Sequence, residues 1–197
     1  MKSIRILSLL VVGIVGVQAT AEMPPKAVIV LDDQFEKRQD IAQFKGDVLV
    51  VLYGDKEGMP ANRSLGEKLH VQYHPTAKGM TPAEAAKAPV TPVPGLRDGQ
   101  RSPELRVLPI ACIGKVPDVV KAIIRNRIKK EAPESPVLLD FETKMKDQFG
   151  LKEGEPNLLV IDAQGRVRMK TAGNLDAPTY TKVLEVINQL RQEAAGK

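Results

Sequence analysis

The sequence predicts an α/β protein, a three-layer sandwich in which a central mixed β-sheet carries helices on both faces. Continuous apolar runs at Val48–Tyr53 and Asn157–Ile161 are typical of strands that are buried on both faces. Amphipathic segments at Val116–Glu131 and Ala177–Ala194 alternate with such runs. This alternation indicates helices packed against a sheet.

The composition is that of an ordinary globular protein. Of the 197 residues, 43% are hydrophobic and 27% are charged, which excludes wholesale disorder and a collagen-like repeat. With residues 1–21 set aside as a signal peptide, residues 22–197 suit one domain with one sizeable core. Loss of Lys2 and Arg5 lowers the formal net charge from +5 to +3, which is too weak to argue for a nucleic-acid partner.

The N-terminus has the pattern of a cleaved export signal. Lys2 and Arg5 precede the apolar run Ile6–Val17, and Ala19-Thr20-Ala21 forms a small-x-small cleavage site. The run is too short to span a bilayer comfortably, and no cysteine lies nearby to carry a lipid anchor. We therefore expect a periplasmic or secreted protein without stable membrane insertion after cleavage. An uncleaved N-terminal anchor is the alternative.

The first half of the exported part begins with a predicted short strand. Ala27–Leu31 is a short β-branched strand, and the turn-prone pair Asp32-Asp33 follows it. The turn Lys45-Gly46-Asp47 then leads into the buried strand Val48–Tyr53, and residues Asn62–Val71 have helical character.

A Pro/Ala-rich insertion occupies approximately residues 74–104. Thr81 as N-cap, Pro82 at the first helical position and Glu84 at the third predict a short helix over Pro82–Lys87. A connection of this length inside a compact domain is uncommon and tends to be mobile or functional.

The second half continues the alternation of strands and helices. Arg106–Ile113 is a strand, and the helix Val116–Glu131 should bury one face. That face carries Val120, Ile123, Ile124 and Ile128. Its basic residues are weighted toward the C-terminal end, where they complement the helix dipole: Lys121, Arg125, Lys129 and Lys130.

The chain then forms three short elements and a long helix. Val137–Asp140 is a strand, and the helix Glu142–Phe149 is closed by Gly150. A hairpin turn at Asp162–Gly165 leads into Arg166–Lys170, whose alternation of apolar and basic residues predicts an antiparallel strand. The buried stripe of the last helix, Ala177–Ala194, is predicted to be Tyr180, Val183, Leu184, Ile187 and Leu190.

Cys112 is the only cysteine, although an exported protein is free to form disulfides. One thiol cannot form an intramolecular bridge, and it cannot resolve a mixed disulfide alone. Its apolar, strand-like surroundings favour a small buried hydrophobe. A reactive thiol and an intermolecular bridge are the alternatives.

Three segments together resemble the thioredoxin-like superfamily, in particular its exported thiol–disulfide oxidoreductase and peroxiredoxin ("redoxin") branches. Leu31–Val51 is similar to the redoxin opening, a hairpin followed by an "FKGK"-like turn and the first central strand. Val137–Leu151 is similar to a strand and helix that end in a "YGV"-like turn. Glu155–Val167 is similar to the "TPTTFLIDxxGxI" segment.

The resemblance implies that Pro156 is a cis-proline facing the redox motif, with Glu155 and Pro156 forming part of a peptide-binding edge. Holding an X-Pro bond cis costs only about 0.5–1 kcal/mol, and such prolines are retained for a structural reason. A trans-proline that simply opens the strand Asn157–Ile161 is the alternative.

The superfamily's cysteine motif is missing from its expected place after the strand Val48–Tyr53. A helix N-terminus there lowers a thiol pKa, but Asp55–Asn62 contains no cysteine, serine or tryptophan. Dithiol exchange is therefore excluded. The resemblance leaves these residues as candidate binding residues: Asp55, Lys56, Glu57, Gly58, Met59, Pro60, Glu155 and Pro156.

The sequence thus favours a non-catalytic thioredoxin-fold module that binds a protein, peptide or small ligand in the exported compartment, with no cofactor and with the insertion beside the site as a recognition segment or lid. One alternative is a one-cysteine thiol oxidoreductase or antioxidant-type enzyme that uses Cys112. Another is a metal carrier that uses His70 and His74, which are spaced four residues apart as on one helix face. Solvent-exposed histidines at a helix end explain the same pair.

Overall fold

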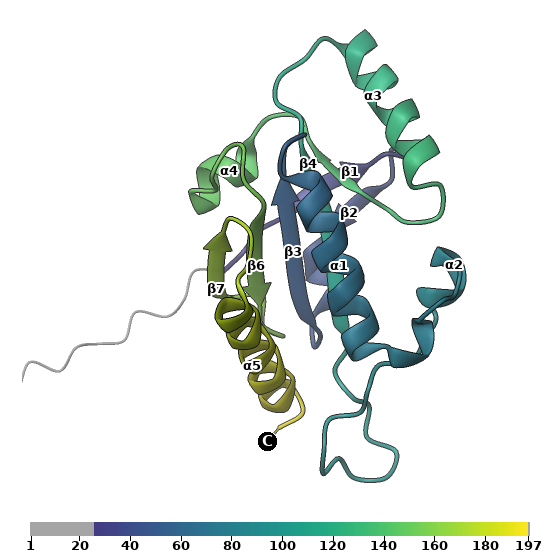
Figure 1. Ribbon diagram of the computed structural model, residues 1–197, viewed down its shortest axis with the longest axis vertical. Helices are drawn as coiled ribbons and strands as arrows, with labels where there is room; N and C mark the ends of the chain where they lie inside the picture. Colours follow the sequence, from purple (N-terminus) through teal and green to yellow (C-terminus); the bar gives the residue numbers. More distant parts are fainter. Residues whose placement is uncertain (1–25, 197) are drawn as a thin grey trace, which may run out of the picture.

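The computed structural model describes residues 26–196, and over this range seven strands form one mixed sheet in the order β2-β1-β5-β4-β3-β6-β7 (Figure 1). The strands are β1 Val30–Asp33, β2 Arg38–Asp40, β3 Val48–Gly54, β4 Leu105–Cys112, β5 Leu138–Asp140, β6 Asn157–Ile161 and β7 Val167–Ala172. The helices are α1 Met59–Tyr73, α2 Pro82–Ala85, α3 Asp118–Glu131, α4 Lys144–Phe149 and α5 Ala177–Ala194, with 3-10 turns η1 Ile41–Phe44 and η2 Pro75–Ala77. The predicted signal peptide lies outside the described residues.

Strand β3 lies inside the sheet, between β4 and β6, and its continuous run of apolar residues suits this buried position. All seven of its residues are buried. It pairs in parallel with β4 and antiparallel with β6, and β4 pairs in parallel with β5. The antiparallel β6–β7 hairpin confirms that the sheet is mixed.

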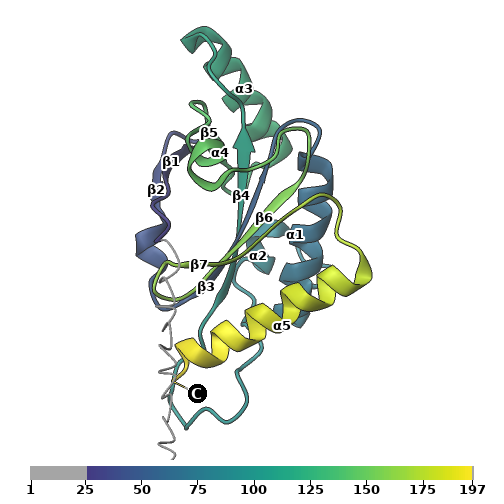
Figure 2. The ribbon, with the colours of Figure 1, turned by 90° about the vertical axis from the view of Figure 1, so that its left-hand side faces the viewer.

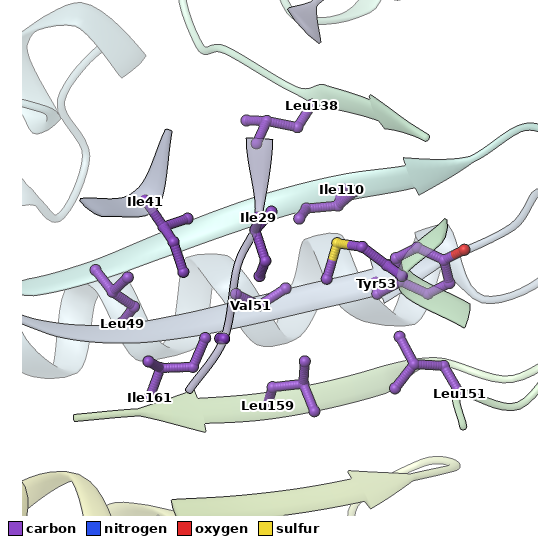
Figure 3. Packing of buried hydrophobic residues seen from close by; sticks show 12 residues of the cluster. Ile29, Ile41, Leu49, Val51, Tyr53, Ile110, Leu138, Leu151, Leu159 and Ile161 are labelled. Atoms are coloured by element: carbon purple, nitrogen blue, oxygen red, sulfur yellow. The ribbon is translucent and has the colours of Figure 1, made fainter. Parts of the chain in front are cut away.

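Helices cover both faces of the sheet, as predicted, and on one face the N-terminal segment packs beside them. On one face, Leu69 of α1 and Ile187 of α5 pack with alternate residues of β3 such as Val50. On the other face, Ile29, Ile41 and Met145 pack against the intervening β3 residues and against β6 (Figure 3). Figure 2 shows α1 and the β1–β2 hairpin on opposite sides of β3.

The predicted N-terminal hairpin is confirmed, but Asp32 and Asp33 belong to strand β1 and not to the turn. They pair antiparallel with Leu139 and Leu138 of β5, and this long-range pairing extends the strand. The turn begins two residues later, at Gln34, where the Asp33 carboxylate accepts hydrogen bonds from the backbone N–H groups of Phe35 (2.8 Å) and Lys37 (3.0 Å).

The prediction that helix α3 buries an apolar face is wrong. None of its residues is buried, and Ile123 keeps 62% of its surface exposed. Ile124 and Ile128 are half-buried, and the Arg125 guanidinium lies over the Phe141 ring, 5.0 Å from its centroid. Both views show α3 extending past the end of β4 (Figures 1 and 2). The exposed apolar side chains of α3 therefore have no strand within residues 26–196 to pack against.

The segment that follows α3 is anchored to the hairpin turn by one buried glutamine. The Gln34 amide donates to the carbonyls of Ala132 (2.9 Å) and Ser135 (2.8 Å), and its oxygen accepts from the Val137 N–H (2.8 Å). The helix is therefore held at its C-terminal end more firmly than along its length.

The Pro/Ala-rich insertion lies at the opposite end of the sheet from the loop between β3 and α1, so the expectation that it flanks the candidate site is wrong. Helix α1 has 15 residues and separates the two by about 22 Å, at 1.5 Å per residue (Figure 1). The capping of α2 is as predicted, because the Glu84 carboxylate accepts from both the N–H (3.1 Å) and the hydroxyl (2.8 Å) of Thr81.

The peptide bond before Pro156 is trans, and residues 26–196 contain no cis peptide bond. The cis-proline that the resemblance implies is therefore wrong. The trans form is the intrinsically preferred one, and local bonds suit it. The side-chain amide of Asn157 donates to the carbonyl of Glu155 (2.9 Å), and the Gly173 N–H donates to the carbonyl of Pro156 (2.9 Å).

Within residues 26–196, no helix has both the length and the apolar character needed to cross a membrane.

Candidate functional site

The loop from Asp55 to Gly58 joins the end of β3 to the start of α1, and the Asp55 side chain organises it. One carboxylate oxygen accepts from the N–H groups of Glu57 (3.2 Å) and Gly58 (3.1 Å), and the other accepts from the Gly154 N–H (2.6 Å). Partial burial opposes ionisation of Asp55, but these backbone donors outweigh it and hold the pKa of the carboxyl below its ordinary value. A charged aspartate therefore organises the loop in which the resemblance implies a thiol.

The structure brings the two predicted segments, Asp55–Pro60 and Glu155–Pro156, into direct contact. Gly58 is buried against the second segment, and a Cβ atom there would lie 2.7 Å from the Glu155 carbonyl oxygen and 2.9 Å from the Pro156 nitrogen. Only glycine allows this approach without displacing the backbone. The two segments therefore form one continuous surface.

The outer side of this surface carries charged and apolar side chains. Lys56, Glu57 and Pro60 are exposed, whereas Met59 is half-buried and packs against the cluster of Ala111, Val137 and Leu139. Lys152 and Glu155 form a loose ion pair at 3.7 Å beside them.

The Glu155 carbonyl already accepts a hydrogen bond from a buried side chain of the protein, that of Asn157. Asn157 is 2% exposed, and its side chain bonds both the carbonyl (2.8 Å) and the N–H (2.8 Å) of Lys152 as well as the Glu155 carbonyl. One of the two lone pairs of the Glu155 carbonyl is therefore used within the protein. Sequence reasoning missed Asn157, although a polar residue at the head of a buried apolar run is a visible signal.

Asn62 is a second buried amide in this region. It is the fourth residue of α1 and is 2% exposed, and neither its amide nitrogen nor its oxygen has a hydrogen-bond partner among the described residues. Its nitrogen lies 2.8 Å from the position of a Cβ on Gly54, so Gly54 is needed for the helix to approach β3.

Cys112 ends β4, at the same edge of the sheet as the loop that follows β3. It is half-buried and packs against the core, in partial agreement with the predicted buried hydrophobe. Burial raises the pKa of its thiol, and the charges of Asp140 and Asp55 add to this, although Tyr53 and Lys146 oppose it. The resting group is a thiol and not an activated thiolate.

Tyr53 and Asp140, the polar neighbours of Cys112, are hydrogen-bonded to each other. Burial raises the pKa of Tyr53, whose hydroxyl donates to the Asp140 carboxylate (3.2 Å). Asp140 also accepts from the backbone N–H groups of Glu142, Lys144 and Met145, and so caps the start of α4. These bonds give Tyr53 and Asp140 a structural role.

His70 and His74 are not the solvent-exposed pair that one reading of the sequence expects. His74 is 4% exposed, and the two rings stack with centroids 4.3 Å apart. The Nε2 atom of His70 faces the Ala85 carbonyl (3.1 Å), whereas that of His74 faces Glu104 (2.6 Å). The nitrogens do not converge, and within residues 26–196 no three His, Cys, Asp or Glu side chains are grouped to hold a metal ion.

The strand order and the position of this loop define the class: the chain has the thioredoxin-like fold and lacks the paired cysteines. No protein-family model matches the sequence, and no curated protein is detectably similar to it. Solved structures are similar to it in fold.

Three of these structures illustrate the likeness. The pneumococcal exposed lipoprotein thioredoxin of Streptococcus pneumoniae has a TM-score of 0.54 and 17% identity, over 81% of this chain and 99% of its own. A putative thiol:disulfide interchange protein DsbE from Chlorobium tepidum has a TM-score of 0.54 and 16% identity, over 86% and 98%. A secreted thiol-disulfide isomerase from Corynebacterium glutamicum has a TM-score of 0.53 and 14% identity, over 89% and 95%.

Proposed function

We propose that the protein is an exported, non-catalytic thioredoxin-fold module that binds a protein or peptide partner at the surface of Asp55–Pro60 and Glu155–Pro156. The observation that carries this proposal is the close contact between the two segments at Gly58 and Glu155. Asp55 and Gly58 hold the loop in one conformation, while Lys56 and Glu57 point their charges to solvent. A preorganised surface loses little conformational entropy on binding.

The thiol chemistry of the fold has no counterpart in this loop. The lone thiol of Cys112 has a raised pKa, which lowers the fraction of nucleophilic thiolate at neutral pH. Binding is therefore favoured over a one-cysteine oxidoreductase.

Two observations support placement in the exported compartment. The first 21 residues have the composition of a signal peptide. The similar Streptococcus pneumoniae protein is an exposed lipoprotein, and the similar Corynebacterium glutamicum protein is secreted.

Site-specific photocrosslinking in cells tests the binding surface. A photoreactive residue at Glu57 is expected to give a discrete crosslinked species, which disappears when Lys56→Glu and Asp55→Ala are introduced. The same residue at Lys182, an exposed position on α5, is the matched control. Identical crosslinks from both positions would contradict the proposal.

A thiol assay provides the second arm. We expect Cys112 to react with iodoacetamide at pH 7 more slowly in the folded protein than after denaturation, and we expect Cys112→Ser to leave crosslinking unchanged. A disulfide-reductase activity that Cys112→Ser abolishes would establish the one-cysteine enzyme instead.

A further inference from the structure

A second concave region lies at the far end of α1, between α1, α5 and the proline-rich part of the insertion. Its cavity has a volume of about 330 Å³, at the lower end of the range for small-molecule sites. Tyr73 contributes from α1, Leu184, Asn188 and Arg191 from α5, and Pro92 and Pro94 from the insertion. None of these residues belongs to the surface described above.

Arg191 is the unusual member of this lining because it is a buried cation. It is 4% exposed, and no carboxylate in residues 26–196 forms an ion pair with it. Glu104, an acid that acts on it electrostatically, is hydrogen-bonded to His74 and to the Leu105 N–H. Burial lowers the pKa of Arg191. A buried charge is costly unless it is paired.

The neutral contacts of Arg191 explain how the insertion is held but leave part of the guanidinium unused. Nε donates to the Pro103 carbonyl (3.0 Å), and Nη2 donates to the Thr91 carbonyl (2.6 Å) and the Ser102 hydroxyl (3.2 Å). A guanidinium has five N–H donors, and these bonds employ three of them. The Nη1 group is left to meet an acceptor.

The rest of the cavity lining supplies a second polar group, the Asn188 amide, and an apolar surface. The Tyr73 hydroxyl donates to the Asn188 side-chain oxygen (3.0 Å), which orients the amide, and the Tyr73 ring lies 5.3 Å from the Arg191 guanidinium carbon. Pro92, Pro94 and Leu184 present only carbon at their side chains. The cavity thus combines an unpaired cation with an apolar surface.

We propose that this cavity binds a small organic carboxylate with an apolar body, one of whose carboxylate oxygens accepts a hydrogen bond from the Nη1 group of Arg191. A hydrogen bond between a guanidinium N–H and a carboxylate is charge-assisted and therefore stronger than one to a neutral acceptor. The apolar body would lie on Pro92, Pro94 and Leu184. This site is independent of the function proposed above.

NMR titration of the full protein with hexanoate tests the proposal, and hexanamide serves as the uncharged isostere. We expect saturable shifts for hexanoate at the backbone amides of Thr91, Val93 and Asn188, with an affinity at least tenfold above that for hexanamide. Equal affinity for the two compounds, or shifts that scatter over exposed lysines without saturation, would overturn the proposal.

Two variants and one control assign the effect to the cavity. Arg191→Met is expected to weaken hexanoate binding at least tenfold, whereas Lys182→Met, at an exposed cation of α5 outside the cavity, should leave it unchanged. Because Arg191 also holds the insertion, Leu184→Trp provides a second test that keeps the charge and fills the cavity. Retention of binding by a folded Leu184→Trp protein would rule out this site.

Discussion

Helices α5 and α3 have the same kind of sequence pattern but opposite fates in the fold. Both carry apolar residues at helical spacing, and both were predicted to bury that stripe. In α5, Val183, Ile187 and Leu190 are buried between the helix and the sheet. In α3 no residue is buried, and Val119 and Ile123 face solvent.

The difference teaches that periodicity identifies the face a helix can bury, while the surface beneath decides whether it does. Helix α5 lies along β3, β6 and β7, which present a continuous apolar surface. Helix α3 extends past the end of β4 and meets the body through Phe141 and the half-buried Ile128 (Figure 2).

The largest expected effect is the loss of an α5 core side chain. Ile187→Ala should lower the free energy of unfolding by about 2–5 kcal/mol, because it leaves a cavity between the helix and the sheet. The matched change Ile123→Ala in α3 should cost less than about 0.5 kcal/mol, since most of that side chain is already in water. Urea unfolding of both variants measures the two costs, and equal costs would show that α3 is buried in solution.

A smaller effect is expected at the anchor of α3. Gln34→Leu removes the amide that bonds Ala132, Ser135 and Val137 and should cost about 1–3 kcal/mol, because it leaves partly or fully buried backbone groups unpaired. Hydrogen exchange should accelerate in residues 132–137 and in α3 but not in α5. Gln43→Leu, at an exposed glutamine, is the control. Unchanged exchange in α3 would mean that the helix is held elsewhere.

The C-terminal end of α1, which carries His70, should make the stability of the protein depend on pH, with a still smaller effect. Burial, followed by the neighbouring His74, lowers the pKa of His70, although the Ala85 carbonyl and Glu104 oppose this. The unfolded chain then binds the proton at higher pH than the folded chain does. Stability should therefore be complete above the ordinary histidine pKa of about 6.5 and decline as the pH falls through that value, until the folded pKa is passed.

Urea unfolding between pH 8 and pH 5 measures this dependence in the native protein and in His70→Gln. The variant should have a flatter profile, because its side chain does not titrate. Identical profiles would show that His70 titrates alike in the folded and unfolded states. Helix α3 has no histidine, so its substitutions should leave the profile unchanged.

The smallest effect is expected at the surface of α3. Arg127 and Glu131 form an exposed pair at 2.9 Å, four residues apart on the helix. Arg127→Ala should change the free energy of unfolding by about 0.3–0.5 kcal/mol at low salt and by less at high salt. A cost above about 1 kcal/mol would indicate that this face of α3 has a partner in solution.

Much of the fold followed from local pattern. The bounds of β6 and α5 were predicted without error, because an unbroken apolar run and a strong helical period are properties of neighbouring residues. The capping of α2 by Thr81 and the end of α4 at Gly150, whose φ of 59° lies in the left-handed region, also depend on short-range chemistry.

The candidate site was predicted only in part. Its two segments were expected to meet because the superfamily brings them together, and Gly58 lies directly against Glu155. The orientation of the Glu155 carbonyl depends on the Asn157 side chain, and the state of the Cys112 thiol depends on Asp140, a residue distant in sequence. Such contacts leave no local signal.

The sequence by itself determined the order of strands and helices, the absence of a cysteine pair and the apolar stripes that the fold had available. Tertiary structure decided that α3 stays exposed, that the bond before Pro156 is trans, and that Arg191 is buried. Arg191 continues the spacing of Ile187 and Leu184 along α5, so its position was visible in the pattern, but its burial needed the insertion to fold over it. The physical reason is that propensity and periodicity act between neighbours, whereas burial and pairing depend on which distant segment fills the space.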